Sequence, residues 1–189
     1  MKMIEEILKA TEVLKNGGVL LYATDTIWGI GCDASNPEAV KKVYAIKKRD
    51  QAKSLIVLVD NHTRLERTVE EVPEVAWDLI EYTEKPLTII YDKPKGIAKN
   101  AINKDQSLGV RIVKDPFCKE LIRRLNKPII STSANISGEK TATCFQEISE
   151  DIKNSVDHIV NLRRDEKNLN QSSMIIKLDA SGLIDIIRK

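Results

Sequence analysis

Two apolar segments separated by a short polar turn decide the fold of this chain, and they have the sequence VLLYATDTIWGIGCD over residues 19–33. Residues 19–22 form an apolar run of the length of a short buried strand. Residues 27–32 resume an extended apolar pattern that includes two glycines. Between them, Thr24-Asp25-Thr26 supplies the short polar side chains that turns favour. The stretch therefore predicts two extended segments with a polar turn between them.

The rest of the chain alternates strands and helices irregularly. The patterns predict strands at residues 55–59, 87–91, 108–113, 128–132 and 156–160, and a closing hairpin of residues 174–178 and 183–188 around a turn at 179–182. They predict helices from the N-terminus to residue 14, from Asn36-Pro37 to Lys47-Lys48-Arg49, at 75–82, from Asp115-Pro116 to residue 125, and briefly near 145–150. This order indicates an α/β fold of α+β type, in which helices cover a mixed sheet in a single domain over residues 1–189.

Composition narrows the class of protein. The 189 residues are 42% apolar and 31% charged, with a formal net charge of +2, which is typical of a globular chain and gives no argument for nucleic-acid binding by itself. No apolar run approaches the roughly 18 residues of a membrane helix. Three distant cysteines, Cys32, Cys118 and Cys144, fit reduced thiols and so predict a cytoplasmic location. The two histidines, His62 in an expected loop and His158 in an expected strand, favour neither a zinc site nor a serine-hydrolase triad.

Six cations gather within residues 41–53. One interpretation is a solvated helix face with a positive end that suits the helix dipole. The other is a site for a polyanion, in which arginine supplies planar bidentate donors and lysine supplies point charge. Lys47, Arg49 and Lys53 differ from Lys41 because they fall in the connection that leads into a predicted strand, where loop side chains line clefts.

A second unusual stretch, IISTSANISG over residues 129–138, runs from a buried strand directly into small polar side chains. These side chains could simply cap a turn. Alternatively, short hydroxyl and amide groups allow a phosphate or a small amino acid to approach closely. Residues 24–26 and Ser172-Ser173 repeat the pattern beside other apolar segments. Three such junctions and a cationic connection predict one cleft that works by positioning and charge stabilisation, as in nucleotidyl transfer from ATP.

These motifs carry a family resemblance. Residues 22–33 (YATDTIWGIGCD) resemble the opening motif of the YrdC-like threonylcarbamoyl-AMP synthases, and residues 44–49 (YAIKKR) followed by Lys53 resemble their Lys-x-Arg motif. Residues 131–138 (STSANISG) are similar to their Ser-x-Asn motif, and residues 108–111 and Ser172-Ser173 match two weaker signatures. The motifs occur in the expected order over nearly the whole chain. The chain departs from the family pattern at Ala23, Asp50, Ser54 and Ser173, where proline or, at the last position, threonine is usual.

The resemblance implies a short, single-domain YrdC-like protein with a twisted mixed sheet around a concave, positively charged cavity. It implies that L-threonine, bicarbonate and ATP are condensed to threonylcarbamoyl-AMP and pyrophosphate, for the modification of adenosine in certain tRNAs. The residues implied for L-threonine are Thr26, Arg111, Ser131 and Ser172, with Arg111 facing the carboxylate. The residues implied for ATP are Lys47, Arg49, Lys53, Ser107, Ser133, Asn135, Thr141 and Arg188, and the catalytic ones among them are Lys47, Arg49, Ser133 and Asn135.

Mg²⁺ is expected with ATP, without named protein ligands, and tRNA-modifying proteins are the expected downstream partners. No membrane partner is expected. An alternative function stays open, in which the same fold and cavity form a module that binds double-stranded RNA or tRNA without synthase activity. Such binding would rest on phosphate contacts and would weaken steeply with salt.

Overall fold

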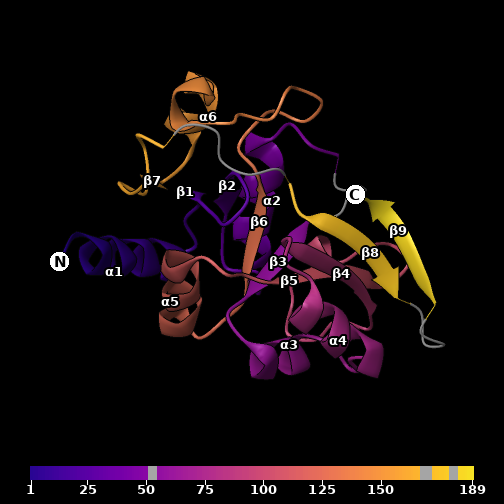
Figure 1. The fold of residues 1–189 in the computed structure, drawn as a ribbon. Coiled ribbons are helices and arrows are strands. Elements are labelled where there is room, and N and C mark those ends of the chain that lie inside the picture. Colours follow the sequence, from indigo (N-terminus) through magenta and orange to yellow (C-terminus); the bar gives the residue numbers. More distant parts are fainter. Residues whose placement is uncertain (51–54, 167–171, 179–182) are drawn as a thin grey trace.

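The computed structural model describes residues 1–50, 55–166, 172–178 and 183–189. Its strands form one mixed sheet in the order β7-β1-β2-β6-β3-β5-β4-β8-β9 (Figure 1). The strand bounds are β1 Leu20–Ala23, β2 Trp28–Gly31, β3 Ile56–Val59, β4 Leu87–Asp92, β5 Ser107–Ile112, β6 Ile129–Ser133, β7 His158–Ile159, β8 Met174–Leu178 and β9 Ile184–Arg188. The mixed sheet that the sequence predicts is therefore confirmed.

The stretch at residues 19–33 forms the hairpin β1–β2. Its strands pair antiparallel from Leu20 opposite Gly31 to Ala23 opposite Trp28. Strand β2 also pairs antiparallel with β6, and β6 pairs antiparallel with β3. Strands β3 and β5 are parallel, as are β1 with β7 and β4 with β8. Strands β6, β3 and β5 thus lie side by side in the middle of the sheet, with β2 next to β6.

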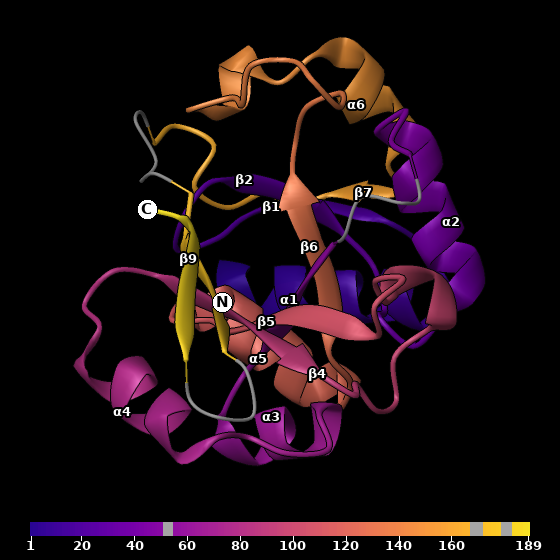
Figure 2. The same ribbon diagram turned by 90° about the vertical axis from the view of Figure 1, so that its right-hand side faces the viewer.

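The helices cover both faces of this sheet. Their bounds are α1 Lys2–Lys15, α2 Pro37–Ile46, α3 His62–Thr68, α4 Glu74–Tyr82, α5 Pro116–Leu125 and α6 Glu150–Ser155, with short 3-10 turns at Lys99–Ala101 and Phe145–Glu147. Alternate residues of β1 enter two different hydrophobic cores, because successive side chains of a strand point to opposite faces. Leu20 and Tyr22 pack with α1 and α5, whereas Leu21 packs in the larger core that includes α2. Figure 2 shows α1 and α5 behind the central strands and α2 at the side.

Two predicted helix starts have the expected caps. The side chain of Asn36 accepts hydrogen bonds from the backbone N–H groups of Glu38 and Ala39, and Pro37 begins α2. The side chain of Asp115 accepts from the N–H of Cys118 at 2.8 Å, and Pro116 begins α5. Both caps use a short polar side chain before a proline, which needs no backbone donor at the first helical position.

Three expectations about local structure are wrong. His62 does not lie in a loop but begins α3, which Asn61 caps by accepting from the N–H of Arg64 at 2.9 Å. The predicted helix near residues 145–150 is instead a 3-10 turn at Phe145–Glu147, followed by the separate helix α6. The strand predicted at 156–160 is shorter than expected and forms only β7, although the N–H groups of Asp157 and Val160 donate to the carbonyls of Val19 and Leu21 at 2.9 Å each.

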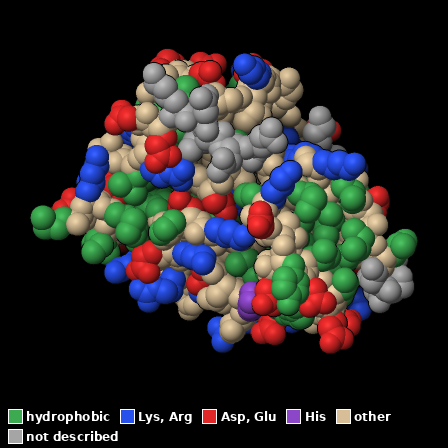
Figure 3. Space-filling model, viewed as in Figure 1, with side chains coloured by type: hydrophobic (Ala, Val, Ile, Leu, Met, Phe, Trp, Pro, Cys, Tyr) green, Lys and Arg blue, Asp and Glu red, His purple; other side chains and the backbone are tan. Residues whose placement is uncertain are grey.

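The closing hairpin is confirmed, since β8 and β9 pair antiparallel; its predicted turn at 179–182 lies outside the described residues. Apolar side chains are visible over α1 and over the β8–β9 edge in Figure 3. The exposed ones include Ile4 and Leu8 on α1 and Ile184, Ile186 and Ile187 on β9. No helix among the described residues is long and apolar enough to cross a membrane.

Candidate active site

A cavity of about 250 Å³ opens where the β1–β2 turn, β5, β6 and β8 come together. Its described lining is Thr24, Thr26, Ile27, Gly29, Arg49, Ile56, Arg111, Ser131, Thr132, Ser133, Thr141, Ser172, Ser173, Ile175 and Arg188. The lining thus holds three arginines and many hydroxyls, and no carboxylate among the described residues. Eight of the twelve residues predicted for the site are in this lining. Lys47, Ser107 and Asn135 are not in the described lining, and Lys53 lies outside the described residues.

The β1–β2 turn carries hydroxyl groups into the cavity. Thr24 and Thr26 lie with their Oγ1 atoms 2.8 Å apart, and Thr24 Oγ1 also accepts from the N–H of Thr26 at 3.1 Å. Thr24 Oγ1 lies 2.9 Å from the carbonyl of Ile27, to which it can donate. The turn is therefore fixed by its own side chains, and Thr26, with 3% exposure, is held in one place.

Arg111 is the charged group that β5 brings to the cavity. It is only 5% exposed, its Nη1 donates to Thr26 Oγ1 at 3.1 Å, and its Nη2 lies 3.3 Å from the carboxylate of Asp25. The Nε atom is buried without a hydrogen-bond partner among the described residues. A buried donor without a partner is costly in a folded protein. Arg111 therefore brings a buried positive charge to the lining of the cavity.

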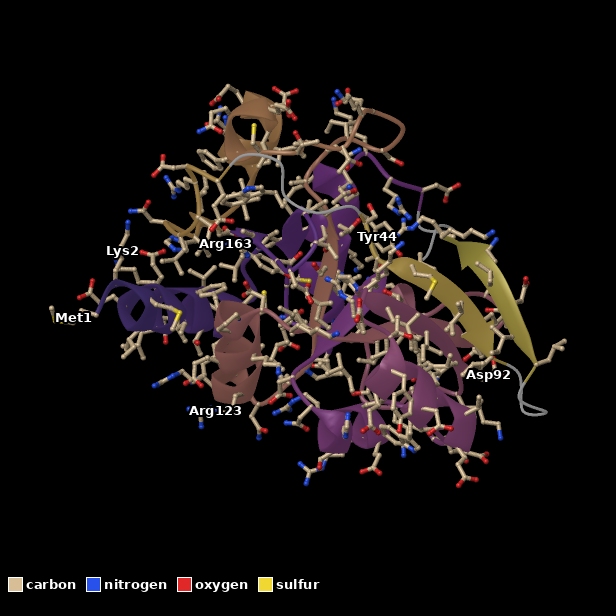
Figure 4. The ribbon with its side chains drawn as sticks, viewed as in Figure 1. Met1, Lys2, Tyr44, Asp92, Arg123 and Arg163 are labelled. Carbon is tan, nitrogen blue, oxygen red and sulfur yellow. The ribbon has the colours of Figure 1, made fainter. Side chains whose placement is uncertain are left out.

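The end of α2 separates two neighbouring cations. Lys48 has φ of 47°, its N–H bonds to the carbonyl of Ala45, and the N–H of Arg49 bonds to the carbonyl of Tyr44. These are the two bonds of a Schellman motif, which reverses the direction of the chain at a helix end. After this turn Arg49 lines the cavity, whereas Lys47 lies buried beneath it with 1% exposure. Tyr44, labelled in Figure 4, marks this end of α2.

Lys47 holds the segment that follows β6. Its ammonium donates to the backbone carbonyls of Ser133, at 2.5 Å, and Asn135, at 2.8 Å. Burial, together with the charge of Arg49, lowers the pKa of Lys47 to about 8. The shortest polar contacts of its ammonium are thus with the protein's own backbone, and longer ones reach Ser133 Oγ at 3.5 Å and Asn135 Oδ1 at 3.4 Å. Asn135 also faces the protein, because its amide donates to the carbonyls of Ile136 and Glu139 at 3.1 and 2.7 Å.

Strand β6 supplies Ser131 and Ser133 to the cavity, and Gly29 of β2 allows the two strands to lie close. A Cβ on Gly29 would meet Ser131 Oγ at 3.1 Å and the carbonyl of Thr132 at 3.2 Å. Ser107 does not line this cavity; its hydroxyl is 2.6 Å from a carboxylate oxygen of Asp105, to which it donates. Lys53 lies outside the described residues.

Arg188 enters the cavity from β9, far along the chain from the other cations. It donates to the carbonyl of Ser173 at 3.0 and 2.8 Å, and Ser173 Oγ lies 2.8 Å from the hydroxyl of Thr88. Partial burial and the charge of Arg111 lower the pKa of Arg188. Thr24 and Ser173 also line the cavity. The sequence places both in polar junctions of the predicted cleft but gives them no ligand role, and the same holds for Asp25, which is not in the described lining.

Comparison with known proteins decides the family. A family model named Sua5_yciO_yrdC, with the description Telomere recombination, matches residues 12–189. The chain belongs to the Sua5/YciO/YrdC family. The resemblance that the motifs carry is thereby confirmed.

Relatives in this family include proteins with a named activity. A protein of Methanocaldococcus jannaschii whose name includes threonylcarbamoyl-AMP synthase is 35% identical over 187 residues, which are 96% of this chain and 86% of the relative. The threonylcarbamoyl-AMP synthase of Pseudoalteromonas translucida is 31% identical over 157 residues, or 82% of this chain and 84% of the relative. That of Pseudoalteromonas atlantica is 33% identical over 149 residues, or 74% and 76%.

Solved structures share the fold. The H234A/Y235A variant of P. abyssi Sua5 matches with a TM-score of 0.87 at 23% identity over all of this chain, and Sua5 complexed with L-threonine matches with 0.82 at 24% identity over 94% of it. The chain spans only 57% and 52% of these two Sua5 chains. Escherichia coli YciO matches with 0.79 at 23% identity, over 97% of this chain and 88% of YciO. The α/β fold of the family is therefore confirmed for this chain.

Proposed function

We propose that this protein is an L-threonylcarbamoyladenylate synthase, which condenses L-threonine, bicarbonate and ATP. Relatives that carry this name cover most of the chain, and the Sua5 structure with L-threonine has the same fold. The observation that carries the proposal is Arg111, a buried arginine that lines the cavity beside its hydroxyls. That combination suits a small amino acid, which brings one carboxylate and one hydroxyl.

In this proposal the threonine subsite is formed by Arg111, Thr26, Ser131 and Ser172. Arg111 pairs with the carboxylate, and the hydroxyls of the other three read the threonine hydroxyl. A site built to hydrogen-bond a substrate hydroxyl rejects analogues that lack it, because its own buried polar groups are then left unpaired. The site should therefore favour threonine over valine.

The ATP phosphates would lie against Arg49 and Arg188, with Ser133 and Thr141 as hydroxyl donors from the same cavity. Lys47 and Asn135 lie behind this surface and hold the backbone that carries Ser133. Lys53 and Ser107 stay predictions of the sequence. A guanidinium suits this task because its planar N–H groups match two phosphate oxygens at once.

The chemistry needs positioning more than it needs a reactive side chain. The threonine nitrogen attacks the carbon of bicarbonate, and a carbamate and one water result. A carbamate oxygen then attacks the α-phosphorus of ATP, the bond from that phosphorus to the β-phosphate oxygen breaks, and pyrophosphate leaves as threonylcarbamoyl-AMP forms. Charge accumulates on the phosphate oxygens in this step, where Arg49 and Arg188 stabilise it. The reaction is thus an adenylyl transfer.

Mg²⁺ is expected to accompany ATP, but the cavity does not fit it as a protein-bound metal. The described lining contains no carboxylate, and the described residues contain no group of three His, Cys, Asp or Glu side chains that could hold a metal ion. Mg²⁺ usually takes one or two carboxylates together with substrate phosphates. The proposed reaction therefore uses none of the described side chains of the cavity as a metal ligand.

The family resemblance also gives the product a destination, which is the threonylcarbamoylation of adenosine in tRNA by downstream tRNA-modifying proteins. We further propose that residues 1–189 act as one YrdC-like domain. Binding of tRNA or double-stranded RNA through the same arginines remains the competing function. The two functions differ in their need for threonine and bicarbonate, so one assay separates them.

The decisive experiment measures pyrophosphate release from ATP with L-threonine and bicarbonate, and omits each component in turn. A synthase releases pyrophosphate only when all three are present, and threonylcarbamoyl-AMP is then identified by mass spectrometry. Release that does not depend on threonine would overturn the proposal. No release, together with tight, salt-sensitive RNA binding, would overturn it in favour of the RNA-binding alternative.

A further inference from the structure

Asp25 lies between two threonines that line the cavity, yet its own side chain is not part of the lining. It borders instead an outer groove that it shares with Lys114. Its Oδ1 lies 3.3 Å from Arg111 Nη2, and its Oδ2 accepts a hydrogen bond of 2.8 Å from the backbone N–H of Lys114. The side chain is 12% exposed. Asp25 therefore contacts Arg111 from the side of the outer groove.

We propose that Asp25 is a positioning residue for the amino-acid subsite, which holds the guanidinium of Arg111 in the orientation that receives the threonine carboxylate. This inference rests on the proposed function and adds to it a residue that does not touch the substrate. Two nitrogens of Arg111 are held by two partners, Thr26 and Asp25, so the plane of the guanidinium is fixed. The buried Nε is the donor that stays without a partner.

The connection through Lys114 makes this arrangement rigid. Arg111 lies in β5, and Lys114 follows the end of that strand by two residues. Asp25 thus forms an ion pair with the side chain of Arg111 and accepts a hydrogen bond from the backbone of the same segment, which links the β1–β2 turn to β5. On the outer side, Arg163 donates to the carbonyl of Thr24 at 2.9 Å and so holds the turn (Figure 4). An arginine side chain otherwise loses about 2 kcal/mol of rotamer entropy when it is immobilised.

Asp25 also supplies the charge that a buried arginine needs. Arg111 shares the cavity with Arg49 and Arg188, and the described lining offers no carboxylate. An unpaired buried cation is costly, and removal of one partner of a buried pair leaves that cost in full. Asp25 compensates Arg111 from outside the cavity, so the guanidinium can stay in place before the substrate arrives.

The experiment compares Asp25→Asn with wild type by pyrophosphate release at varied threonine and varied ATP. Asparagine keeps the size of the side chain and an oxygen for the N–H of Lys114, but it removes the charge that holds Arg111. We expect the KM for threonine to rise about tenfold, since small displacements of a positioning group are costly, while the KM for ATP changes less than about twofold. The ratio of kcat/KM for L-threonine over L-threonine methyl ester should fall as well, because the ester lacks the anionic carboxylate.

Asp60→Asn is the matched control. Asp60 is also a buried aspartate paired with an arginine, Arg64, at 2.5 Å, and it does not contact Arg111. It should lower stability without raising the KM for threonine selectively. If Asp25→Asn does not fold, Asp25→Glu, which keeps the charge on a longer side chain, takes its place and should raise the KM for threonine more than that for ATP.

The outcomes separate this inference from the proposed function. If the wild-type protein does not need threonine for pyrophosphate release and does not bind it in calorimetry, both the proposed function and the role of Asp25 are refuted. If the wild type is active, three results with the Asp25 variants would refute the positioning role of Asp25 alone. These are an unchanged KM for threonine, an equal rise of both KM values, and an unchanged ratio of kcat/KM for threonine over its methyl ester.

Discussion

The close approach of β2 to β6 makes a sharp test of how the site is built. A Cβ placed on Gly31 would lie 2.0 Å from the carbonyl oxygen of Ile130 and 2.8 Å from the hydroxyl of Tyr22. The first of these atoms belongs to the backbone of a paired strand, so no side-chain rotation relieves the contact. We therefore expect Gly31→Ala to push the two strands apart by about 1 Å, beyond what a well-packed interior accommodates.

The expected cost follows from three contributions. An alanine in a strand gains about 0.5–1 kcal/mol over glycine in backbone entropy. Overpacking of a core typically costs about 1–3 kcal/mol or more, and each weakened strand bond costs about 1 kcal/mol. The pairs at risk are Gly29 with Ser133 and Ile30 with Thr132. On balance Gly31→Ala should lower the free energy of unfolding by about 3 kcal/mol or more, a large part of the usual 5–15 kcal/mol.

Alanine substitutions at two other glycines of the sheet should lower stability less, because their Cβ contacts are longer. On Gly109 a Cβ would meet only Thr88 Cγ2 at 3.3 Å and Ile56 Cγ1 at 3.8 Å, so Gly109→Ala should change stability by less than about 1 kcal/mol. On Gly29 the contacts are 3.1 Å to Ser131 Oγ and 3.2 Å to the carbonyl of Thr132, and Gly29 itself lines the cavity. Gly29→Ala should therefore be intermediate in stability and should raise the KM for threonine.

The assay is urea unfolding followed by circular dichroism, with pyrophosphate release measured on the variants that fold. The order of midpoints should be Gly109→Ala highest, Gly29→Ala next and Gly31→Ala lowest, with similar m-values. Equal midpoints for Gly31→Ala and Gly109→Ala would refute the close contact between β2 and β6. A Gly29→Ala variant with an unchanged KM for threonine would refute the placement of threonine beside Ser131.

Three further predictions test the cations and the specificity. Arg49→Ala should lower kcat/KM for ATP by about tenfold to a hundredfold, as expected for a lost charge-assisted contact. Lys41→Ala removes only an exposed ion pair with Glu38 and should have almost no effect; equal effects of the two substitutions would show that only diffuse charge matters. Serine should be the best substitute for threonine and valine a much poorer one, and pyrophosphate release with valine at or above that with serine would contradict a hydroxyl-reading site. Burial and the charge of Arg49 lower the pKa of Lys47 from 10.5 to about 8, so the unfolded chain binds this proton more tightly than the folded one. The free energy of unfolding should therefore rise between pH 8 and 10.5, by up to about 3 kcal/mol. Lys47→Met should abolish this rise, and parallel curves of unfolding free energy against pH for wild type and variant would exclude the effect.

Local patterns were sufficient for most of the fold. The apolar runs at residues 19–22 and 174–178 fixed their strands because side-chain periodicity and burial coincide there. The caps Asn36 and Asp115 marked two helix starts because each lies directly before a proline. Helix α3 escaped prediction because only Leu65 and Thr68 of its seven residues are buried, which leaves no apolar stripe to recognise.

Partnerships across long sequence separations could not be predicted in the same way. Asp25 belongs to the β1–β2 turn and Arg111 to β5, and nothing near either residue in the sequence points to the other. The same holds for Arg188, which reaches the cavity only because β9 pairs with β8 at its edge. The family resemblance supplied the candidates Arg111 and Arg188, but it gave no reason to include Asp25, which supports the site from outside.

The Lys-x-Arg motif shows what a sequence pattern leaves open about chemistry. Lys47 and Arg49 are two residues apart and carry the same charge, so the pattern alone assigns both to the phosphates. The intervening Lys48 adopts a positive φ that no glycine announces, and the chain reverses there. Arg49 then faces the cavity, while Lys47 donates to the carbonyls of Ser133 and Asn135. One motif thus provides both a cation for the ligand and a buried cation that shapes the β6 segment opposite it.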